Sequence, residues 1–263
     1  MNATMFWAVF GFLTLLGTAV LIAWVAFLIG RWLGGREARR EHPEHEGPVG
    51  SVVGATLALL AFTLAITFNM AHEKHNDRKQ LVREEVKAIR SAYDRALLLP
   101  AGAAQKAHVL LAEYARIRAF DTFKEPDVPL GQMITRSEEI QRELWLQAVE
   151  YRDDPQIRFY LDALSTLTST HAERVTMGIH DRVPAAVWVC LAIVTGLGML
   201  TMGYQSGLAG SHRAWAMIPL VVAVCVVLCI ALDLDRPQQG ILRVDQGPMI
   251  RLAGALDELP PDL

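Results

Sequence analysis

The sequence predicts an all-α membrane protein, with four transmembrane helices and a large helical extramembrane insertion between the second and third spans. Three observations indicate this class. Of the 263 residues, 52% are hydrophobic and 20% are charged, and the two kinds are segregated along the chain. Four apolar runs reach the roughly 20 residues of helix that cross a bilayer. The polar stretch between the second and third runs repeats its apolar residues at helical spacing.

The four apolar runs contain no internal charged residue apart from Arg31, at the end of the first. They cover residues 5–32, 49–70, 183–202 and 214–232. The first run is interpreted as a retained helix rather than a cleaved signal peptide, because it is long and no basic residue precedes it. Pro219 lies inside the fourth run and predicts a kink there.

The polar insertion, residues 71–182, holds 17 of the 25 Lys and Arg and 18 of the 28 Asp and Glu. This near balance indicates solvated helix faces and not a nucleic-acid surface. Apolar stripes, with breaks near Pro100 and at residues 124–131 and 153–156, predict helices over about 71–99, 102–121, 131–151 and 155–181. The stripes are Val82, Val86, Ile89 and Tyr93; Leu110, Tyr114 and Ile117; and Ile157, Leu161, Leu164, Thr168, His171 and Val175. No Gly or Pro separates the second span from the first of these helices, which predicts one rod of roughly 50 residues.

These patterns divide the chain into five parts. The expected boundaries are 1–48 (first span and basic loop), 49–70 (second span), 71–182 (helical domain), 183–232 (third and fourth spans) and 233–263 (extramembrane tail). Orientation follows from the basic residues that flank the spans. Five arginines border the two short loops and three lie in the tail, so the loops are expected in the cytoplasm and the helical domain and both termini outside.

Three stretches together resemble the bestrophin-like family of bacterial integral membrane proteins, a domain family of unknown function. They are "GATLALLAFTLAITF" in the second span, "RKQLVREEVKAIRSAYDRALLLP" after it, and "LDLDRPQQGILRV" after the last span. The resemblance covers about residues 50–252. It implies a multi-pass protein of the bacterial inner membrane and, by analogy with bestrophin anion channels, a homo-oligomer such as a pentamer that conducts an ion. Bestrophins keep their helical domain in the cytosol, whereas the arginine count favours the opposite side.

The second span offers a candidate pore lining. Thr56, Leu60, Thr63 and Thr67 follow helical spacing and lie on one face. A ring of such helices would present hydroxyls to a water-filled pore. The alternative is that each threonine bonds the carbonyl four residues earlier or a neighbouring helix.

Two carboxylates, Asp233 and Asp235, end the last span, where the helix dipole is already negative and an unpaired charge is costly. We expect Asp235 to pair with an arginine or to cap backbone N–H groups, and so to clamp the tail onto the helical domain. Cation binding by both carboxylates is the alternative. The candidate clamp residues are Asp233, Asp235, Arg236, Pro237, Gly240, Glu85 and Arg83.

The other histidines and charged segments are interpreted as structural and not as metal-binding or ligand-binding sites. His72 and His75 lie one turn apart, but with no further ligands they are expected in the headgroup zone and not in a metal site. The same holds for the loop "EHPEHE" (41–46). His171 is expected to be a hydrogen-bonded core histidine. The charge-rich segment 83–96 is interpreted as a solvated face or an inter-helix salt-bridge face, with a vestibule lined by Glu85, Arg90 and Asp94 as the alternative.

No phosphate-binding loop, nucleophile elbow, zinc-protease helix or dinucleotide fingerprint occurs in the chain. The sequence therefore predicts no enzyme, no cofactor and no nucleic-acid partner. The lipid bilayer is the expected environment. The favoured function is an oligomeric ion channel. The alternative is a membrane-anchored structural or sensory scaffold whose helical domain docks a partner.

Overall fold

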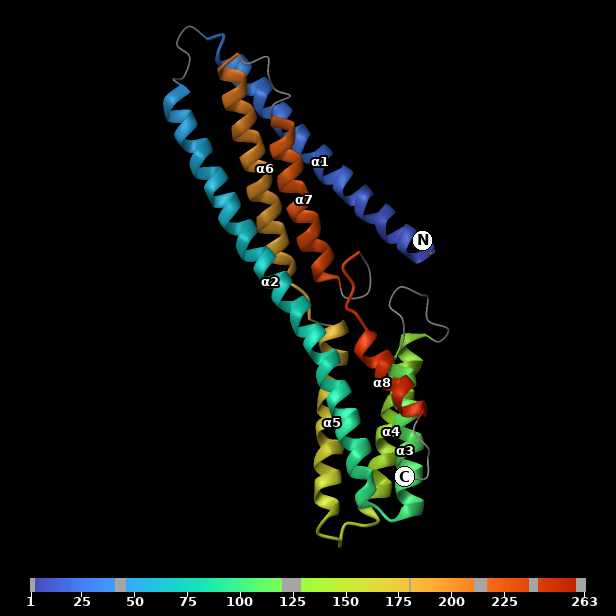
Figure 1. The fold of residues 1–263 in the computed structure, drawn as a ribbon. Coiled ribbons are helices and arrows are strands. Elements are labelled where there is room, and N and C mark those ends of the chain that lie inside the picture. Colours follow the sequence, from blue (N-terminus) through green and yellow to red (C-terminus); the bar gives the residue numbers. More distant parts are fainter. Residues whose placement is uncertain are drawn as a thin grey trace. The chain divides into compact units, whose positions relative to one another are not determined.

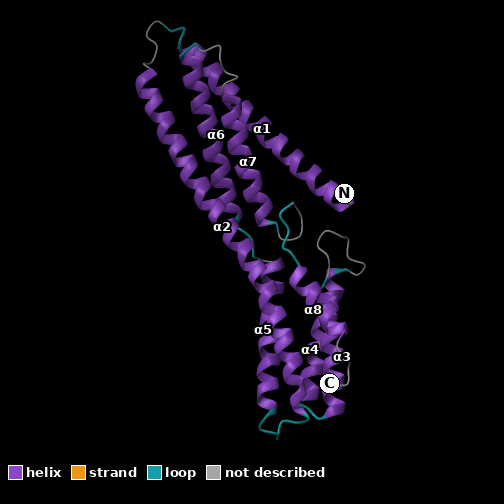
Figure 2. Ribbon diagram, in the orientation of Figure 1, coloured by secondary structure: helices purple, strands orange, loops and turns teal. Residues whose placement is uncertain are grey.

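A computed structural model describes residues 3–40, 46–119, 129–179, 181–210, 217–236 and 241–258. These residues form helices joined by short loops, with no strand among them (Figure 2). The chain divides into two compact units. The span unit comprises Phe6–Lys74 and Arg182–Leu242. The polar unit comprises Met1–Met5, His75–Asp181 and Arg243–Leu263.

The span unit contains the four apolar helices that the sequence predicts. They are α1 (Ala3–Glu37), the first half of α2 (Glu46–Arg95), α6 (Ala185–Leu208) and α7 (Ile218–Asp235) (Figure 1). All four are long and apolar enough to cross a membrane. Their shared core includes Phe27, Leu60, Leu191, Met199 and Val221. Large apolar side chains such as Trp7, Ile22 and Phe62 are exposed, which a lipid-facing surface tolerates and water does not.

Helices α1 and α6 approach so closely that only glycine fits between them. A Cβ on Gly30 or Gly34 would overlap the backbone carbonyl of Leu200 or Tyr204. Gly203 and Gly207 of α6 are under the same constraint from the α1 backbone. Small residues at these positions let the two backbones pack directly, as is common between membrane helices.

The predicted kink at Pro219 is wrong. Helix α7 begins at Ile218 and has Pro219 in its first turn. A proline there removes no intrahelical hydrogen bond, because the first N–H groups of a helix have no intrahelical acceptor. The residues before Met217 that were assigned to this span, 214–216, lie outside the described part of the chain.

The polar unit contains the second half of α2, the turn η1 (Ala96–Leu98), α3 (Ala101–Arg118), α4 (Leu130–Val149), α5 (Ile157–Ile179) and α8 (Gly247–Glu258). Each predicted helix is present within a few residues, and α2 is a continuous helix of 50 residues, as expected. Pro100 and Pro129 stand at the N-caps of α3 and α4. The expected break at residues 124–131 falls mostly outside the described residues.

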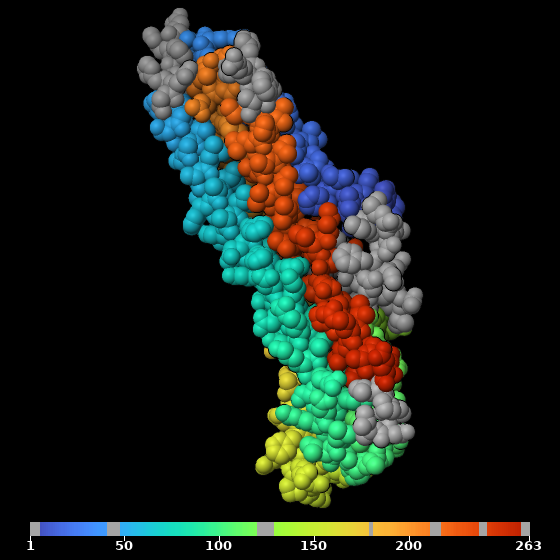
Figure 3. All heavy atoms as spheres, in the orientation of Figure 1, coloured from blue at the N-terminus to red at the C-terminus, as the bar shows by residue number. Residues whose placement is uncertain are grey.

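Helix α8 was not predicted, since residues 233–263 were expected only as an extramembrane tail. Met249, Leu252, Ala253 and Leu256 of α8 are buried in the core of the polar unit. Figure 3 shows α8, in red, on the surface of this unit beside the second half of α2. The C-terminal segment is therefore part of the helical core.

Candidate functional site

A carboxylate lies at the centre of the polar unit. Glu85 of α2 is fully buried. It occupies the same face of the helix as Val82, Ile89 and Ala92, which are also buried. Helical spacing thus places Glu85 on the core stripe, where it belongs to an inter-helix salt-bridge face, one of the two expected forms of this stretch, and not to a solvated face or a vestibule. A buried carboxylate requires cationic or hydrogen-bonding partners.

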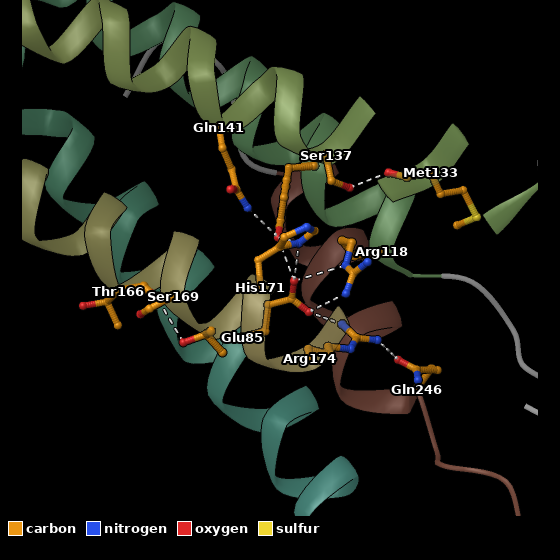
Figure 4. A network of polar contacts seen from close by, with 12 residues as sticks. Glu85, Arg118, Met133, Ser137, Gln141, Thr166, Ser169, His171, Arg174 and Gln246 are labelled. Carbon is orange, nitrogen blue, oxygen red and sulfur yellow. Dashed lines mark hydrogen bonds and ion pairs between the residues drawn. The ribbon is translucent and has the colours of Figure 1, made fainter. Parts of the chain in front are cut away.

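Two arginines from other helices provide the positive charge. Arg118 of α3 donates from Nε to Glu85 Oε1 at 3.1 Å, and its Nη2 lies 3.5 Å from Oε2. Arg174 of α5 donates to Oε2. Both guanidinium groups are largely buried, and Figure 4 shows them converging on the carboxylate. Charge-assisted bonds of this kind are stronger than neutral ones.

Tyr114 of α3 completes the first layer of contacts. Its hydroxyl donates to Glu85 Oε1 at 2.7 Å and lies 2.9 Å from His171 Nδ1. Because the single phenolic proton is used on Glu85, His171 must donate from Nδ1 to the phenol oxygen. Gln141 of α4 also donates to this oxygen, at 3.2 Å. His171 is thus a buried, hydrogen-bonded histidine, as expected from its place on the apolar stripe.

The arrangement favours the ionised carboxylate. Burial alone raises the pKa of Glu85. The charge of Arg174, the contact with His171 and the charge of Arg118 outweigh burial and hold that pKa well below its ordinary value. Burial and the neighbouring Glu85 charge raise the pKa of Tyr114 well above its ordinary value. The tyrosine therefore stays a neutral donor while Glu85 stays an anion.

The network reaches the C-terminal segment. Arg174 Nη2 donates to Gln246 Oε1 at 2.7 Å, and Gln246 immediately precedes α8. The Glu85 centre, which we define as Glu85, Tyr114, Arg118, Gln141, His171, Arg174 and Gln246, thus joins α2, α3, α4, α5 and the segment before α8. Its chemistry is that of an electrostatic anchor that fixes the relative positions of these elements.

Sequence reasoning missed most of this centre, although a signal exists. Arg118 lies four residues after Tyr114 on the buried face of α3, and Arg174 follows His171 by three on α5. One acidic and two basic residues therefore occupy core positions of three predicted helices. Charged residues at core positions are rare unless they are paired with each other.

The candidate pore-lining residues are divided between two environments. Thr56 and Thr63 are half-buried, whereas Leu60 and Thr67 are buried inside the span unit. Leu60 and Thr56 face Gly198 of α6. All three threonine hydroxyls donate to the carbonyl four residues earlier, at 2.8 to 2.9 Å.

The two carboxylates at the end of α7 are buried and accept backbone hydrogen bonds. Asp235 Oδ1 accepts from Val183 N–H at 2.8 Å. Asp233 accepts from Ile241 N–H at 3.0 Å and from Leu242 N–H at 2.7 Å. Among the other candidate clamp residues, Arg236 and Arg83 are exposed, and Pro237 and Gly240 lie outside the described residues.

Metal-binding geometry is not found in the described part of the chain, where no three His, Cys, Asp or Glu side chains are grouped suitably. His72 stacks beside Phe68 of the same helix, with ring centroids 6.2 Å apart. Residues 41–45 of the histidine-rich loop lie outside the residues that the structure describes.

Four apolar helices and a helical polar unit define an all-helical membrane protein. Crystal structures of a bacterial bestrophin homolog from Klebsiella pneumoniae share the fold. Two variants of it match with TM-scores of 0.64 and 0.59, both at 14% identity. The first match covers 95% of each chain, and the second covers 94% of this chain and 99% of that one. A third variant matches with a TM-score of 0.62 at 15% identity, over 94% of this chain and 96% of that chain.

The family model described as the bestrophin-like domain matches residues 17–249. The chain therefore belongs to the bestrophin-like family and is a bestrophin-type membrane protein. No curated protein matches it in sequence.

Proposed function

We propose that this protein is an oligomeric, multi-pass ion channel of the bacterial inner membrane and not an enzyme. The observation that carries the proposal is the family match over residues 17–249, together with a fold shared with bestrophin homologs over nearly the whole chain. A homo-oligomer, with a pentamer as the family analogy, provides the closed ring that a central pore requires. The exposed apolar surface of the span unit supports contact with lipid and with neighbouring copies.

We propose that Thr56 and Thr63, the half-exposed residues of the candidate pore face of α2, line the pore. Thr56 and Thr63 are accessible from outside the single chain, and Leu60 and Thr67 support them from behind. Each neighbouring copy would add its own two threonines to the ring of α2 helices around the pore. Half-exposed hydroxyls that already donate to their own helix can still accept hydrogen bonds from pore water.

We assign residues 71–182 to an extramembrane domain, with the boundaries given in the sequence analysis. Its core forms without lipid, since the buried apolar side chains of α2, α3, α4 and α5 cover each other. From the arginine count we expect this domain and both termini outside the cytoplasm. Reporter fusions after Leu263 should be active outside it, and those at Glu44 inside it. The opposite pattern would restore the bestrophin-like orientation.

The tail clamp also remains a proposal, now with specific contacts in its support. In the span unit, Asp233 and Asp235 hold backbone N–H groups around the end of α7. In the polar unit, Arg174 holds Gln246 while it also donates to Glu85. The contact between Arg174 and Gln246 would keep the C-terminal segment on the helical domain, while Asp233 would keep Ile241 and Leu242 at the end of α7.

Ion flux into liposomes that contain the purified protein tests the channel. In a background without Cys190, Cys225 and Cys229, a water-soluble thiol reagent should block flux through Thr63→Cys. The matched control is Thr67→Cys, one turn away and buried, which should remain unaffected. Absence of flux under every ion gradient would overturn the channel, and equal block of both variants would overturn the pore-lining face. The scaffold alternative predicts that crosslinking in native membranes recovers a partner besides the chain itself.

A further inference from the structure

Helices α4 and α5 form a groove on the surface of the polar unit that the channel proposal does not use. Its volume is about 540 Å³, in the range of small-molecule sites. The α4 wall presents Glu138, Gln141, Arg142 and Trp145, which fall on one face at helical spacing. These four side chains are long.

The opposite wall is formed by small side chains of α5, which leave the space open. Ser165, Thr168 and Ala172 line it, and all three are exposed. Thr168 was expected on the buried stripe of this helix. The buried stripe instead includes Leu164 and Leu167, and Thr168 faces outward beside them. Hydroxyl groups on this wall offer both hydrogen-bond donors and acceptors.

The charged groups of the α4 wall are unpaired among the described residues. Glu138 and Arg142 lie one turn apart, yet no ion pair forms between them or with another described side chain. On the same helix Arg136, by contrast, contacts Glu113 at 2.8 Å and two further glutamates. The groove therefore presents a carboxylate and a guanidinium that have no partner among the described residues, on positions whose Cα atoms are about 6 Å apart along the helix axis.

Trp145 provides an apolar surface next to these charges. Its side chain is 42% exposed, and it is the one tryptophan of the six in the chain that lies within residues 71–182. An exposed indole beside opposite charges and hydroxyls matches the requirements of a ligand with an ammonium group, a carboxylate and an apolar side chain. We propose that the groove binds a free amino acid with an apolar or aromatic side chain. Glu138 receives the ammonium group, Arg142 the carboxylate, and Trp145 the side chain.

The groove is also linked to the Glu85 centre. Gln141 lines the groove, and its Nε2 donates to Tyr114, whose hydroxyl donates to Glu85. A ligand that draws the Gln141 amide toward the groove weakens this contact. Binding in the groove thus acts on the anchor that joins the helices of the polar unit. This site is independent of ion conduction, so its test does not depend on the channel.

Calorimetric titration of the full-length protein in lipid nanodiscs tests the site with three probes. L-phenylalanine should bind saturably. N-acetyl-L-phenylalanine lacks the ammonium group and L-phenylalaninamide lacks the carboxylate, so each should bind about fivefold more weakly, the loss expected for one exposed ion pair. Glu138→Gln should remove the preference over the N-acetyl compound, and Arg142→Gln the preference over the amide. Arg152→Gln, at an exposed position outside the groove, is the matched control and should bind like the wild type.

Three results would overturn the proposal. The first is no saturable binding of phenylalanine up to its solubility limit. The second is equal binding of all three probes, which would indicate a merely apolar surface. The third is that both charge variants retain the wild-type preferences. Because Glu138 and Arg142 are exposed and unpaired, their variants should unfold at the wild-type temperature, and that measurement separates a lost site from a lost fold.

Discussion

The Glu85 centre makes a quantitative prediction for the substitution Glu85→Gln. Glutamine keeps the shape of the side chain and one carbonyl acceptor but removes the negative charge. Arg118 and Arg174 would then remain buried with no anion beside them. An unpaired buried charge costs far more than a broken surface pair, because neither water nor a counter-ion compensates it.

The expected loss follows from the burial of the partners. Removing one member of a buried ion pair destabilises a protein by about 3–5 kcal/mol. The glutamine carbonyl still accepts a hydrogen bond from an arginine, so we expect the lower end, about 3 kcal/mol. For a chain of this size each kcal/mol lowers the melting temperature by roughly 2–4 °C, so the shift should be about 6–12 °C.

Thermal unfolding of the full-length protein in nanodiscs measures this shift, with Glu84→Gln as the matched control. Glu84 is the preceding residue, half-buried, and its partner is Gln80 on the same helix at 2.7 Å. We expect this control to unfold within about 0.5 kcal/mol of the wild type, as for most surface substitutions. The double variant Glu85→Gln with Arg174→Gln should recover part of the loss, because it removes one of the uncompensated charges.

The effect of Glu85→Gln on the melting temperature should also depend on pH. The pKa of Glu85 is lower in the folded protein than its ordinary value of 4.5, because the arginines outweigh the opposing effect of burial. Its stabilisation is therefore complete above that ordinary value and is lost as the pH falls toward the folded-state pKa. The difference in melting temperature between wild type and Glu85→Gln should be constant near neutral pH and should narrow in acid. A shift equal to that of Glu84→Gln, or a difference independent of acid pH, would refute the reasoning.

Three further predictions concern other contacts. Gly203→Ala should destabilise the span unit by about 1–3 kcal/mol, because the added Cβ would lie 2.9 Å from the Phe27 carbonyl carbon. Gly196→Ala, on the same helix where the space is open, should be neutral or stabilising. Equal melting temperatures for the two variants would contradict the close approach of the helices. Asp235→Asn should lower thermal stability by about 1–3 kcal/mol regardless of divalent ions; if a chelator alone reproduces the loss in wild type and the variant ignores the chelator, the site binds a metal. Gln246→Ala should speed amide exchange in α8 but not in α4, since it releases the Arg174 contact, and unchanged α8 exchange would argue against an anchoring role.

The sequence determined where the helices lie, because the signals for a helix are local. Apolar runs of sufficient length identified the four membrane helices. The spacing of apolar residues identified α3 and α5, and the breaks on either side delimited α4, each within a few residues of the helix ends. The continuous α2 followed from the absence of Gly and Pro across the junction at residue 70. These properties depend on neighbours within a few turns of the chain.

Some local signals were ambiguous without tertiary contacts. A proline kinks or ends a helix when it lies in the interior, but it is tolerated in the first turn. Because α7 begins at Ile218, Pro219 lies in the first turn and no kink is needed. Helix α8 is only 12 residues long and would be marginal alone. Burial of Met249 and Leu252 against the polar unit stabilises it.

The candidate site was decided by tertiary structure. Glu85 is one of several charged residues in a charge-rich helix, and only its place on the apolar stripe, three residues after Val82 and four before Ile89, distinguishes it from Glu84. Its partners Arg118 and Arg174 lie 33 and 89 residues further along, and only packing brings them to one point. Periodicity can place a charge on the core side of a helix. It cannot say which distant charge meets it there, because the energy of a buried ion pair depends on the position of both partners.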